Sequence, residues 1–373
     1  MLVLTVNSGS TSVKLAAFAS ASARGALAAV RREQCPGGTS DARAVLRAFL
    51  RQLDASAVAA VAHRVVHGGA QFSQAVVVDA SVEASLRALV ALAPLHNPLA
   101  LHWIEAARAE CAAAVRQIAA FDTAFYSDLP RVAAQYALPR AQGVDLGVRR
   151  YGFHGIAHEA MWRRWCALHP QLARGGRIIT LQLGGGCSAT AIESGRPLDT
   201  SMGFSPLEGL MMATRSGDVD PAAVAYLAEK QQVPAARIVE FLNRECGLLG
   251  VSGVSSDLRA LIADPSEAAR FAVELYCYRV RKCLGAYLTV LGGCEGIVFG
   301  GGVGEHMPEI RARILAPLRW LGVELDAAAN EAARGGEARI TQPASRIAVY
   351  VLPADEEHAI ASAALACLAA QPA

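Results

Sequence analysis

The sequence predicts an α/β fold made of two related domains. Three observations support this: strand-like and helix-like segments alternate along the 373 residues, a strand–loop–strand pattern occurs twice, and glycine-rich turns follow three strands. At about 150 residues per domain, the length favours two or three domains. A hydrophobic content of 53% is enough to build their cores.

The elements follow from local residue patterns, taken in chain order. Runs of β-branched and apolar residues predict strands at 2–6, 13–18, 57–61, 115–121, 178–183, 188–193, 296–299 and 346–352. Apolar residues at helical spacing predict helices at 42–53, 81–92, 98–111, 221–230, 234–245, 266–291 and 359–370.

An internal repeat connects the two predicted domains. Aligning Gly9 with Gly184, an offset of 175, pairs the strand at 3–6 with the strand at 178–181. The match is short, so chance is the alternative. If the repeat is real, each domain opens on a strand–turn–strand phosphate loop, and a nucleotide lies in the cleft between the domains.

Composition excludes several classes of protein. The 35 basic and 33 acidic residues leave a net charge of +2, which disfavours a general nucleic-acid binder. The start of the chain lacks the basic region of a signal peptide, and no apolar run is long enough for a membrane span. Nine cysteines without a CxxC pattern disfavour a disulfide framework and a zinc ribbon, so we expect a cytoplasmic protein.

The first glycine loop, residues 7–14, has the chemistry of a phosphate site. Backbone N–H groups around Gly9 and the hydroxyls of Ser10 and Ser12 can bind phosphate oxygens, and Lys14 adds a positive charge. The alternative is an ordinary polar hairpin. The chain contains neither GxxxxGK[ST] nor a GxGxxG placed between a strand and a helix, so P-loop and dinucleotide folds lack support.

Two further glycine clusters, 184–186 and 300–304, also follow strands. Glycine lets a backbone approach a ligand closely, and a following helix N-terminus favours anions. The alternative for each cluster is a tight turn. Together with the repeat, the three loops favour a nucleotide.

Basic and histidine side chains recur in short, turn-like segments. They are Arg64, His67, His96, His154, His158 and Arg215. His154 and His158 have the spacing of a metal pair, but Gly155 stands where HExxH has Glu. Stabilisation of phosphoryl oxygens is the better interpretation, with structural ion pairs and core histidines as the alternatives.

Carboxylates that suit Mg²⁺ follow two predicted strands. Asp122 comes after the strand at 115–121, and Glu356 and Glu357 come after the strand at 346–352. Asp218, Asp220 and Asp257 are alternative ligands, and solvated helix caps are the other interpretation.

Nine stretches, read together, resemble the acetate kinase family of the actin-like sugar kinase and chaperone ATPase superfamily. They are VNSGSTSVK (6–14), HRVVHGG (63–69), APLHNP (93–98), FDTAFYSDLP (121–130), RRYGFHGIAH (149–158), DTSMGFSPLEGLMMATRSGDVDP (199–221), GLLGVSGVSSDLR (247–259), IVFGGGVGEH (297–306) and LPADEE (352–357). They run in family order over nearly the whole chain.

The resemblance implies two actin-like (ribonuclease H-like) domains. The first comprises 1–147 with the C-terminal helix 358–373, and the second, nucleotide-binding domain comprises 148–357. It also implies a homodimer.

The resemblance assigns roles to individual residues. The catalytic positions are Asp122, His154 and Arg215, and the metal positions are Asn7 and Glu356. The acyl substrate is expected at Arg64, which grips its carboxylate, and at Val66, Leu95, His96, Phe153 and Pro206. The nucleotide is expected at Ser10, Ser12, Lys14, Gln182, Leu183, Gly184, Gly185, Gly186, Asp257, Leu258, Arg259, Gly302, Val303, Gly304, Glu305 and His306.

The implied activity is reversible, in-line transfer of the ATP γ-phosphoryl group to acetate, which gives acetyl phosphate and ADP with Mg²⁺ or Mn²⁺. The alternatives are a propionate or other short-chain acyl kinase, and a nucleotide-binding member with weakened transfer. Two departures motivate the last alternative: Gln182 and Gly185 replace the usual His and Asn. A third departure is His306, which replaces the Asn of GIGEN. The small residues Gly302 and Val303 leave ATP favoured over pyrophosphate.

Overall fold

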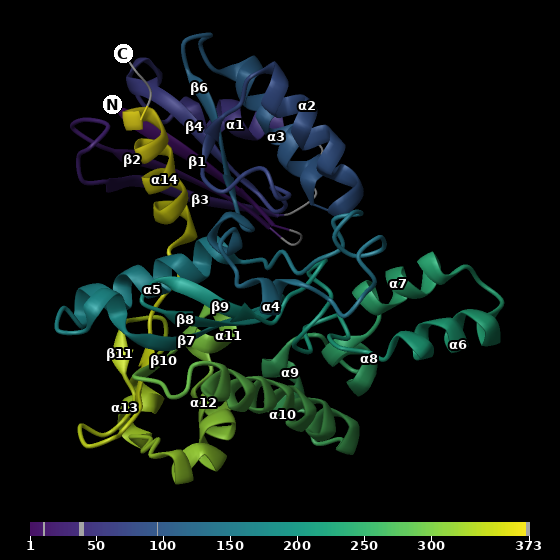
Figure 1. Ribbon diagram of the computed structural model, residues 1–373. Coiled ribbons are helices and arrows are strands. Elements are labelled where there is room, and N and C mark those ends of the chain that lie inside the picture. The colour runs from purple at the N-terminus through teal and green to yellow at the C-terminus, as the bar shows by residue number, and fades with distance from the viewer. Residues whose placement is uncertain (10–11, 37–40, 95, 371–373) are drawn as a thin grey trace. The chain divides into compact units, whose positions relative to one another are not determined.

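The computed structural model describes residues 1–9, 12–36, 41–94 and 96–370 (Figure 1). The chain divides into two compact units: residues 1–127, 153–160 and 355–373 form the first, and residues 128–152 and 161–354 form the second. The helix α5 (Gly155–Leu168) begins in the first unit and ends in the second. The domain boundaries given by the resemblance differ from these units and stay a prediction.

The first unit contains a six-stranded sheet of order β3-β2-β1-β4-β6-β5. Its strands are β1 (Leu2–Ser8), β2 (Ser12–Ala19), β3 (Ala28–Pro36), β4 (Val58–Val65), β5 (Val76–Val77) and β6 (Arg116–Phe121). Its helices are α1 (Ala42–Leu50), α2 (Ala80–Ala88), α3 (Asn97–Glu110) and α14 (Glu356–Ala370).

Helices cover both faces of this sheet. Because successive side chains of a strand point to opposite faces, alternate residues pack into two different cores. Leu4 and Leu15 face one core, together with Phe49 of α1 and Trp103 of α3. Val3, Ala16 and Phe18 face the other core, which α14 covers with Ile360 and Ala364. Helices on both faces are typical of an α/β fold.

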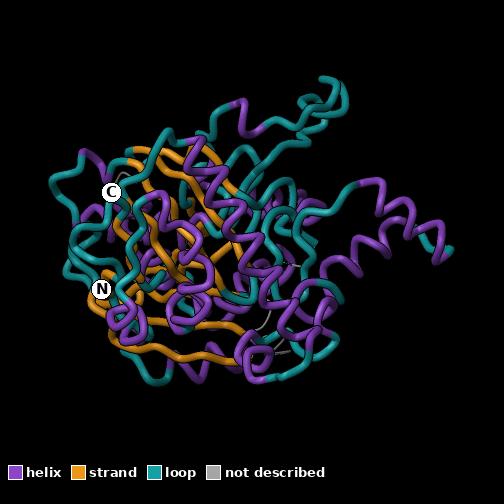
Figure 2. Tube along the Cα trace, turned by 90° about the horizontal axis from the view of Figure 1, so that it is seen from below, coloured by secondary structure: helices purple, strands orange, loops and turns teal. Residues whose placement is uncertain are grey.

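The second unit contains a sheet of order β11-β12-β10-β7-β8-β9. Its strands are β7 (Arg177–Leu183), β8 (Cys187–Glu193), β9 (Arg196–Thr200), β10 (Gly296–Gly300), β11 (Ala338–Arg339) and β12 (Ala348–Val351). Its helices are α4 (Arg131–Ala134), α6 (Pro221–Gln231), α7 (Ala235–Arg244), α8 (Gly247–Ser252), α9 (Leu258–Ala263), α10 (Glu267–Val290), α11 (Gly301–His306), α12 (Pro308–Leu315) and α13 (Ala327–Ala332). α6 and α7 pair and extend away from the rest of this unit (Figure 2).

The two sheets share one topology. β1 pairs antiparallel with β2 and parallel with β4, which pairs parallel with β6. β7 pairs in the same way with β8 and β10, and β10 pairs parallel with β12. Because β1 and β7 are the strands that the internal repeat aligned, the predicted α/β class with two related domains is confirmed.

The segment around His154 and His158 differs from the expected turn. His154 precedes α5 with φ +58°, whereas His158 lies inside α5 and is fully buried. The prediction of a turn at His158 was wrong. Ile156, Met161 and Trp165 are all buried along this helix, and their helical spacing outweighs the turn signal of the neighbouring glycines. No helix in the described part of the chain is long and apolar enough to cross a membrane.

Candidate active site

Three parallel strands of the first unit end at the same edge of their sheet, where three predicted site residues lie. Asn7 lies near the end of β1, Arg64 near the end of β4, and Asp122 directly after β6. The carboxyl edge of parallel strands is the usual place for ligands in α/β folds. Sheet topology therefore brings together side chains that are far apart in sequence.

Arg64 and Asp122 form a buried ion pair at this edge. The Arg64 Nη2 atom donates to Asp122 Oδ2 at 2.6 Å, and Nε donates to Oδ1 at 3.0 Å. The side chains are 12% and 1% exposed. Arg64 Nη1 lies 3.4 Å from Asn7 Oδ1, so the guanidinium joins all three strand ends.

Burial and the neighbouring charges shift the pKa values of this pair in opposite directions. Burial by itself lowers the pKa of Arg64, but the negative charges of Asp122, Glu356 and Glu357 and the hydrogen bond to Asp122 raise it above its ordinary value. Burial also raises the pKa of the Asp122 carboxyl, and the charge of Arg64 counteracts part of that rise. Arg64 therefore remains a cation inside the protein.

Asn7 links the end of β1 to the start of α14. Its Nδ2 donates to Glu356 Oε2 and to Glu357 Oε1, both at 2.7 Å. Glu357 Oε1 also lies 3.8 Å from the ammonium of Lys14, whose side chain is 46% exposed. The sequence pattern names Glu357 beside Glu356 as a possible Mg²⁺ ligand, whereas the family resemblance gives a role to Glu356 alone. Both lie in the first turn of α14.

His154 is attached to Asp122 through the backbone. Its N–H donates to the Asp122 carboxylate, and the N–H of Gly155 donates to the Asp122 carbonyl at 3.0 Å. A Cβ at Gly155 would lie 2.1 Å from that carbonyl oxygen, so only glycine fits. The positive φ of His154 is rare for a side-chain-bearing residue and is typical of functional sites.

Two of the residues expected around the acyl group, Val66 and Phe153, are buried in the first unit. Val66 and Phe153 are 6% and 1% exposed, and the Phe153 ring meets the His67 ring edge-on at 5.5 Å. His96 occupies the position just before α3, and the next residue, Asn97, exchanges two hydrogen bonds with the His67 backbone. Leu95 and the nucleotide candidate Ser10 lie outside the described residues.

In the second unit, two of the predicted nucleotide segments lie side by side. β7 and β10 pair in parallel up to Gly300 and Gln182, so the loop 184–186 and α11 both begin at the carboxyl edge of the sheet. A Cβ at Gly184 would lie 3.9 Å from the N atom of Gly302. At Gly301, φ is +76° and a Cβ would lie 2.5 Å from the Leu183 carbonyl, so glycine is required there.

Two glycines of these segments face open space. A Cβ at Gly185 or at Gly302 would meet no atom within 4 Å. The Gly184 N–H donates to the Gly186 carbonyl at 3.0 Å and closes the first turn. The buried Oε1 of Gln182 has no hydrogen-bond partner among the described residues. Loops with exposed backbone and open space suit a bound phosphate chain.

A fully buried arginine braces the second of these segments. Arg311 Nη1 donates to the carbonyls of Gly304 and Glu305 at 2.8 and 3.1 Å. Its other nitrogens donate to Asn330 Oδ1 and to the carbonyls of Asn330 and Ala333. Burial lowers the pKa of Arg311 to about 10. Sequence reasoning missed this residue because nothing in its local pattern marks it as buried.

The other members of the segment are also held in place. Glu305 Oε1 accepts from the Gly301 N–H at 2.9 Å, and Val303 continues α11. His306 leaves no space for a side chain at Gly335, where a Cβ would lie 2.3 Å from its ring.

The remaining predicted residues of the second unit form two local contacts. Asp257 caps α9, which begins at Leu258, and accepts from Arg259 Nη2 at 2.7 Å. That hydrogen bond lowers the pKa of Asp257. Arg215 Nη1 donates to the Pro206 carbonyl at 3.0 Å.

The donor atoms near Asn7 suit a hard divalent cation. The Asn7 amide oxygen and the Glu356 carboxylate are oxygen ligands of the kind that Mg²⁺ prefers, and water completes such sites. The charge of Glu356 raises the pKa of both Arg64 and Asp122, so the Glu356 carboxylate lies near the Asp122 carboxylate. In the described ranges, no group of three or more His, Cys, Asp or Glu side chains forms a metal site.

Comparisons with known proteins agree with this architecture. The chain is 44% identical to an acetate kinase of Solibacter usitatus over 321 residues, which cover 85% of this chain and 78% of the relative. It is 45% identical to an acetate kinase of Rhodopseudomonas palustris over 329 residues, which cover 87% and 82%.

Two solved structures superpose on nearly the whole chain. The crystal structure of Porphyromonas gingivalis acetate kinase has a TM-score of 0.87 and 37% identity, and covers 98% of this chain and 99% of its own. A propionate kinase from Francisella tularensis has a TM-score of 0.87 and 32% identity, with coverages of 97% and 98%. The model of the acetokinase family matches residues 30–362, and the chain belongs to this family.

Proposed function

We propose that this protein is an acetate kinase, which transfers the γ-phosphoryl group of ATP reversibly to acetate. The observation that carries the proposal is the buried Arg64–Asp122 pair, with Asn7, Glu356 and Lys14 at the same sheet edge. A phosphate and a carboxylate are both anions, so their reaction needs concentrated positive charge. The first unit contributes Arg64, Lys14 and His154, but Asp122 and Glu357 pair with Arg64 and Lys14, so further positive charge would come from Arg215 and a bound divalent cation.

The acceptor does not require a general base. A small carboxylic acid has a pKa of about 4 to 4.5 and is already ionised at pH 7. Asp122 then orients Arg64 and the nucleophile rather than removing a proton. Arg64 Nη1 faces Asn7 at 3.4 Å, so this edge of the guanidinium is less committed than the two nitrogens that bind Asp122.

We assign the nucleotide to the glycine segments of the second unit and to Asp257–Arg259. Arg215, which the Pro206 carbonyl holds, stabilises the charge on the phosphoryl group during transfer. Asn7 and Glu356 would hold Mg²⁺, with Mn²⁺ as the alternative ion. When bound, the cation offsets the negative charge of the phosphates.

A hydroxamate assay with acetate, ATP and Mg²⁺ tests the proposal. We expect acetyl phosphate to form, and we expect Arg215→Ala to lower turnover by roughly 100-fold or more. No acyl phosphate with acetate, propionate or butyrate, and with either ATP or pyrophosphate, would instead support a nucleotide-binding protein with lost transfer. Turnover of Arg215→Ala close to that of the parent would remove the role given to Arg215.

Propionate is the second candidate substrate, because a propionate kinase shares this fold at a TM-score of 0.87. The buried Val66 favours acetate, since a larger acyl chain needs a smaller residue there. One methylene changes binding by about 1–3 kcal/mol, so the two activities overlap. The ratio of kcat/KM for acetate and propionate, before and after Val66→Ala, distinguishes them.

We also infer a homodimer. Support comes from the large apolar side chains that the second unit exposes, among them Val219, Tyr226, Phe271 and Tyr278. Light scattering of the purified protein measures its mass directly. A cytoplasmic location stays a prediction.

A further inference from the structure

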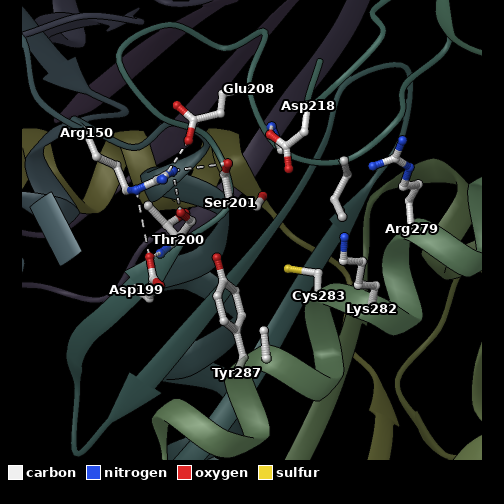
Figure 3. A pocket seen from close by; sticks show the side chains of 13 residues that line it. Arg150, Asp199, Thr200, Ser201, Glu208, Asp218, Arg279, Lys282, Cys283 and Tyr287 are labelled. Atoms are coloured by element: carbon white, nitrogen blue, oxygen red, sulfur yellow. Dashed lines mark hydrogen bonds and ion pairs between the residues drawn. The ribbon is translucent and has the colours of Figure 1, made fainter. Parts of the chain in front are cut away.

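Two clusters of charged side chains differ in their balance of charge. The first cluster lines a cavity of about 200 Å³ in the second unit, between α10 and the segment 199–218 (Figure 3). It contains three carboxylates and three cations, which are Asp199, Glu208, Asp218, Arg150, Arg279 and Lys282. The charges of these described residues cancel, so the cavity gives no reason to expect a bound ion.

The second cluster lies in the first unit, around the start of α14. Hydrogen bonds and ion pairs connect four carboxylates and three cations there, with Asn7 between them. The carboxylates are Asp122, Asp355, Glu356 and Glu357, and the cations are Lys14, Arg32 and Arg64. The surplus of one negative charge fits the divalent cation that the proposed function assigns to Asn7 and Glu356.

The chemistry of its neighbours fixes the orientation of the Asn7 amide. Glu356 Oε2 and Glu357 Oε1 lie 2.7 Å from one amide atom, and Arg64 Nη1 lies 3.4 Å from the other. Ionised carboxylates only accept and a guanidinium only donates, so the nitrogen faces α14 and the oxygen faces Arg64. A rotated amide would bring its oxygen against two carboxylates. Asn7 is only 4% exposed, so water could not easily compensate for that contact.

The two glutamates that accept from Asn7 are held differently. The side chain of Glu357 is 8% exposed, and both of its oxygens face cations: Oε1 lies 3.8 Å from Lys14 Nζ, and Oε2 lies 3.6 Å from Arg32 Nη1. Within the described ranges, Glu356 accepts a single hydrogen bond, from Asn7 at Oε2. Its Oε1 is therefore left for another partner. Glu356 is the better placed of the two to bind a cation, and Glu357 is the better placed to hold Asn7.

Arg32 keeps Glu357 in place from the edge strand β3. Its Nη1 and Nη2 donate to the two carboxylate oxygens of Asp355 at 3.0 and 2.5 Å. Asp355 in turn accepts from the His358 N–H at 3.0 Å, at the start of α14. The Arg32 guanidinium also lies 5.4 Å from the centre of the Phe18 ring. These contacts fix the arginine, so its positive charge stays beside Glu357 Oε2.

We propose that Glu357 is a positioning residue, which holds the Asn7 amide so that Oδ1 is available to a divalent cation. An amide oxygen has two lone pairs, and Arg64 Nη1 at 3.4 Å uses at most one of them. With Glu356 occupied by the cation, Glu357 is the acceptor that still binds Asn7 Nδ2. A residue that binds a metal ligand in this way orients the ligand. The inference rests on the proposed function, which assigns Asn7 and Glu356 to the cation.

Titration of the full-length protein with Mn²⁺ alone, followed by the electron paramagnetic resonance of free Mn²⁺, tests the proposal. Glu357→Leu removes the acceptor and should weaken Mn²⁺ binding by roughly tenfold or more. Glu357→Gln lacks the charge but keeps an oxygen that can accept from Asn7 Nδ2. It should therefore lose clearly less affinity than Glu357→Leu.

Glu309→Leu is the matched control. Glu309 also lies in the first turn of a helix and pairs with an arginine, Arg313, but it belongs to α12. This variant should bind Mn²⁺ like the parent.

Steady-state kinetics of acetyl phosphate formation give a second measurement. In Glu357→Leu, the Mg²⁺ concentration that gives the half-maximal rate should rise. The KM for acetate should stay close to that of the parent, because Arg64 keeps its hydrogen bonds to Asp122. A general loss of structure would change both constants, so this separation distinguishes positioning from a merely structural role.

Parent-like Mn²⁺ binding by Glu357→Leu would overturn the proposal. Equal losses in Glu357→Leu and Glu357→Gln would also overturn it, because they would mean that the Glu357 charge binds the cation directly. Absence of Mn²⁺ binding by the parent would show that there is no cation site to position.

Thermal melting establishes that each variant is folded. If Glu357→Leu does not fold, Glu357→Gln decides by itself, and a loss of roughly tenfold or more in that variant would contradict the positioning role. The Mn²⁺ titration does not depend on phosphoryl transfer. A protein that forms no acetyl phosphate would therefore fail the kinase proposal without deciding the role of Glu357, which the titration measures separately.

Discussion

Arg64 and Asp122 join the ends of β4 and β6 through hydrogen bonds of 2.6 and 3.0 Å, and both side chains are nearly inaccessible to solvent. The pair fixes two nitrogens of the guanidinium and leaves Nη1 near Asn7. A buried cation held in this way can act on a substrate without reorganising. Removal of one partner would leave the other charge buried and unpaired, so it should affect both activity and folding.

Arg64→Ala should destabilise the protein by about 3 kcal/mol, because it leaves the buried Asp122 carboxylate without its partner. It should also raise the KM for acetate more than the KM for ATP. Urea unfolding and steady-state kinetics measure the two effects. The double variant Arg64→Ala/Asp122→Ala should lose less stability than the sum of the single variants. Additive losses would mean that the pair does not act as a unit.

Gly185→Asn should lower the KM for ATP. A Cβ at Gly185 meets no atom within 4 Å, so the loop has room for the side chain, and the added amide can donate to a phosphate oxygen. Thermal melting should show unchanged stability, and nucleotide titration should show tighter binding.

Gly301→Ala is the contrasting variant for this loop. The φ of Gly301 is +76°, and an added Cβ would lie 2.5 Å from the Leu183 carbonyl oxygen. We therefore expect Gly301→Ala to lose stability and nucleotide binding together. If Gly185→Asn behaved in the same way, the space beside Gly185 would not be available to a side chain.

Arg311→Met should loosen the segment 301–306 and weaken nucleotide binding. The carbonyls of Gly304 and Glu305 would lose their donor inside the core, where an unsatisfied acceptor costs about 1–3 kcal/mol. We expect a higher KM for ATP with little change in the KM for acetate, together with a lower melting temperature. Arg313→Met on the exposed face of α12 is the control, and equal effects of the two variants would contradict the bracing role.

Much of the fold could be predicted because its signals are local. Alternation in β1 and β2 separates Leu4 and Leu15 from Val3 and Phe18, and each set faces its own core. The aligned glycines Gly9 and Gly184 follow equivalent strands of two sheets with the same topology.

The features that the sequence does not reveal are specific side-chain contacts. The hydrogen bond between Asn7 and Glu357 joins residues 350 positions apart, and Arg311 binds carbonyls 6 to 22 positions away that residue periodicity does not identify. The α5 helix was missed because the glycines near its start are typical of a turn. Met161 and Trp165, further along the helix, are buried in a core.

Three histidines of the first unit should make stability depend on pH. Burial lowers the pKa of His63 and His67 to about 4 and that of His158 to about 3. Because these values lie below the ordinary value of 6.5, the unfolded chain takes up protons first as the pH falls. The stabilisation is therefore complete above about pH 6.5 and is lost progressively toward pH 4.

The variant His63→Gln tests this linkage between histidine protonation and stability. Between pH 7.5 and 5.5, each such histidine should lower the free energy of unfolding by about 1.4 kcal/mol, and the variant should lack that contribution. His63 is suitable because its Nε2 contacts Gln117 Oε1 at 2.9 Å in a fully buried position on β4. Urea unfolding at both pH values measures the difference. Ile118→Val, also buried in this sheet, should lower stability equally at both pH values because it does not titrate. A pH dependence of His63→Gln equal to that of the parent would show that this histidine does not contribute.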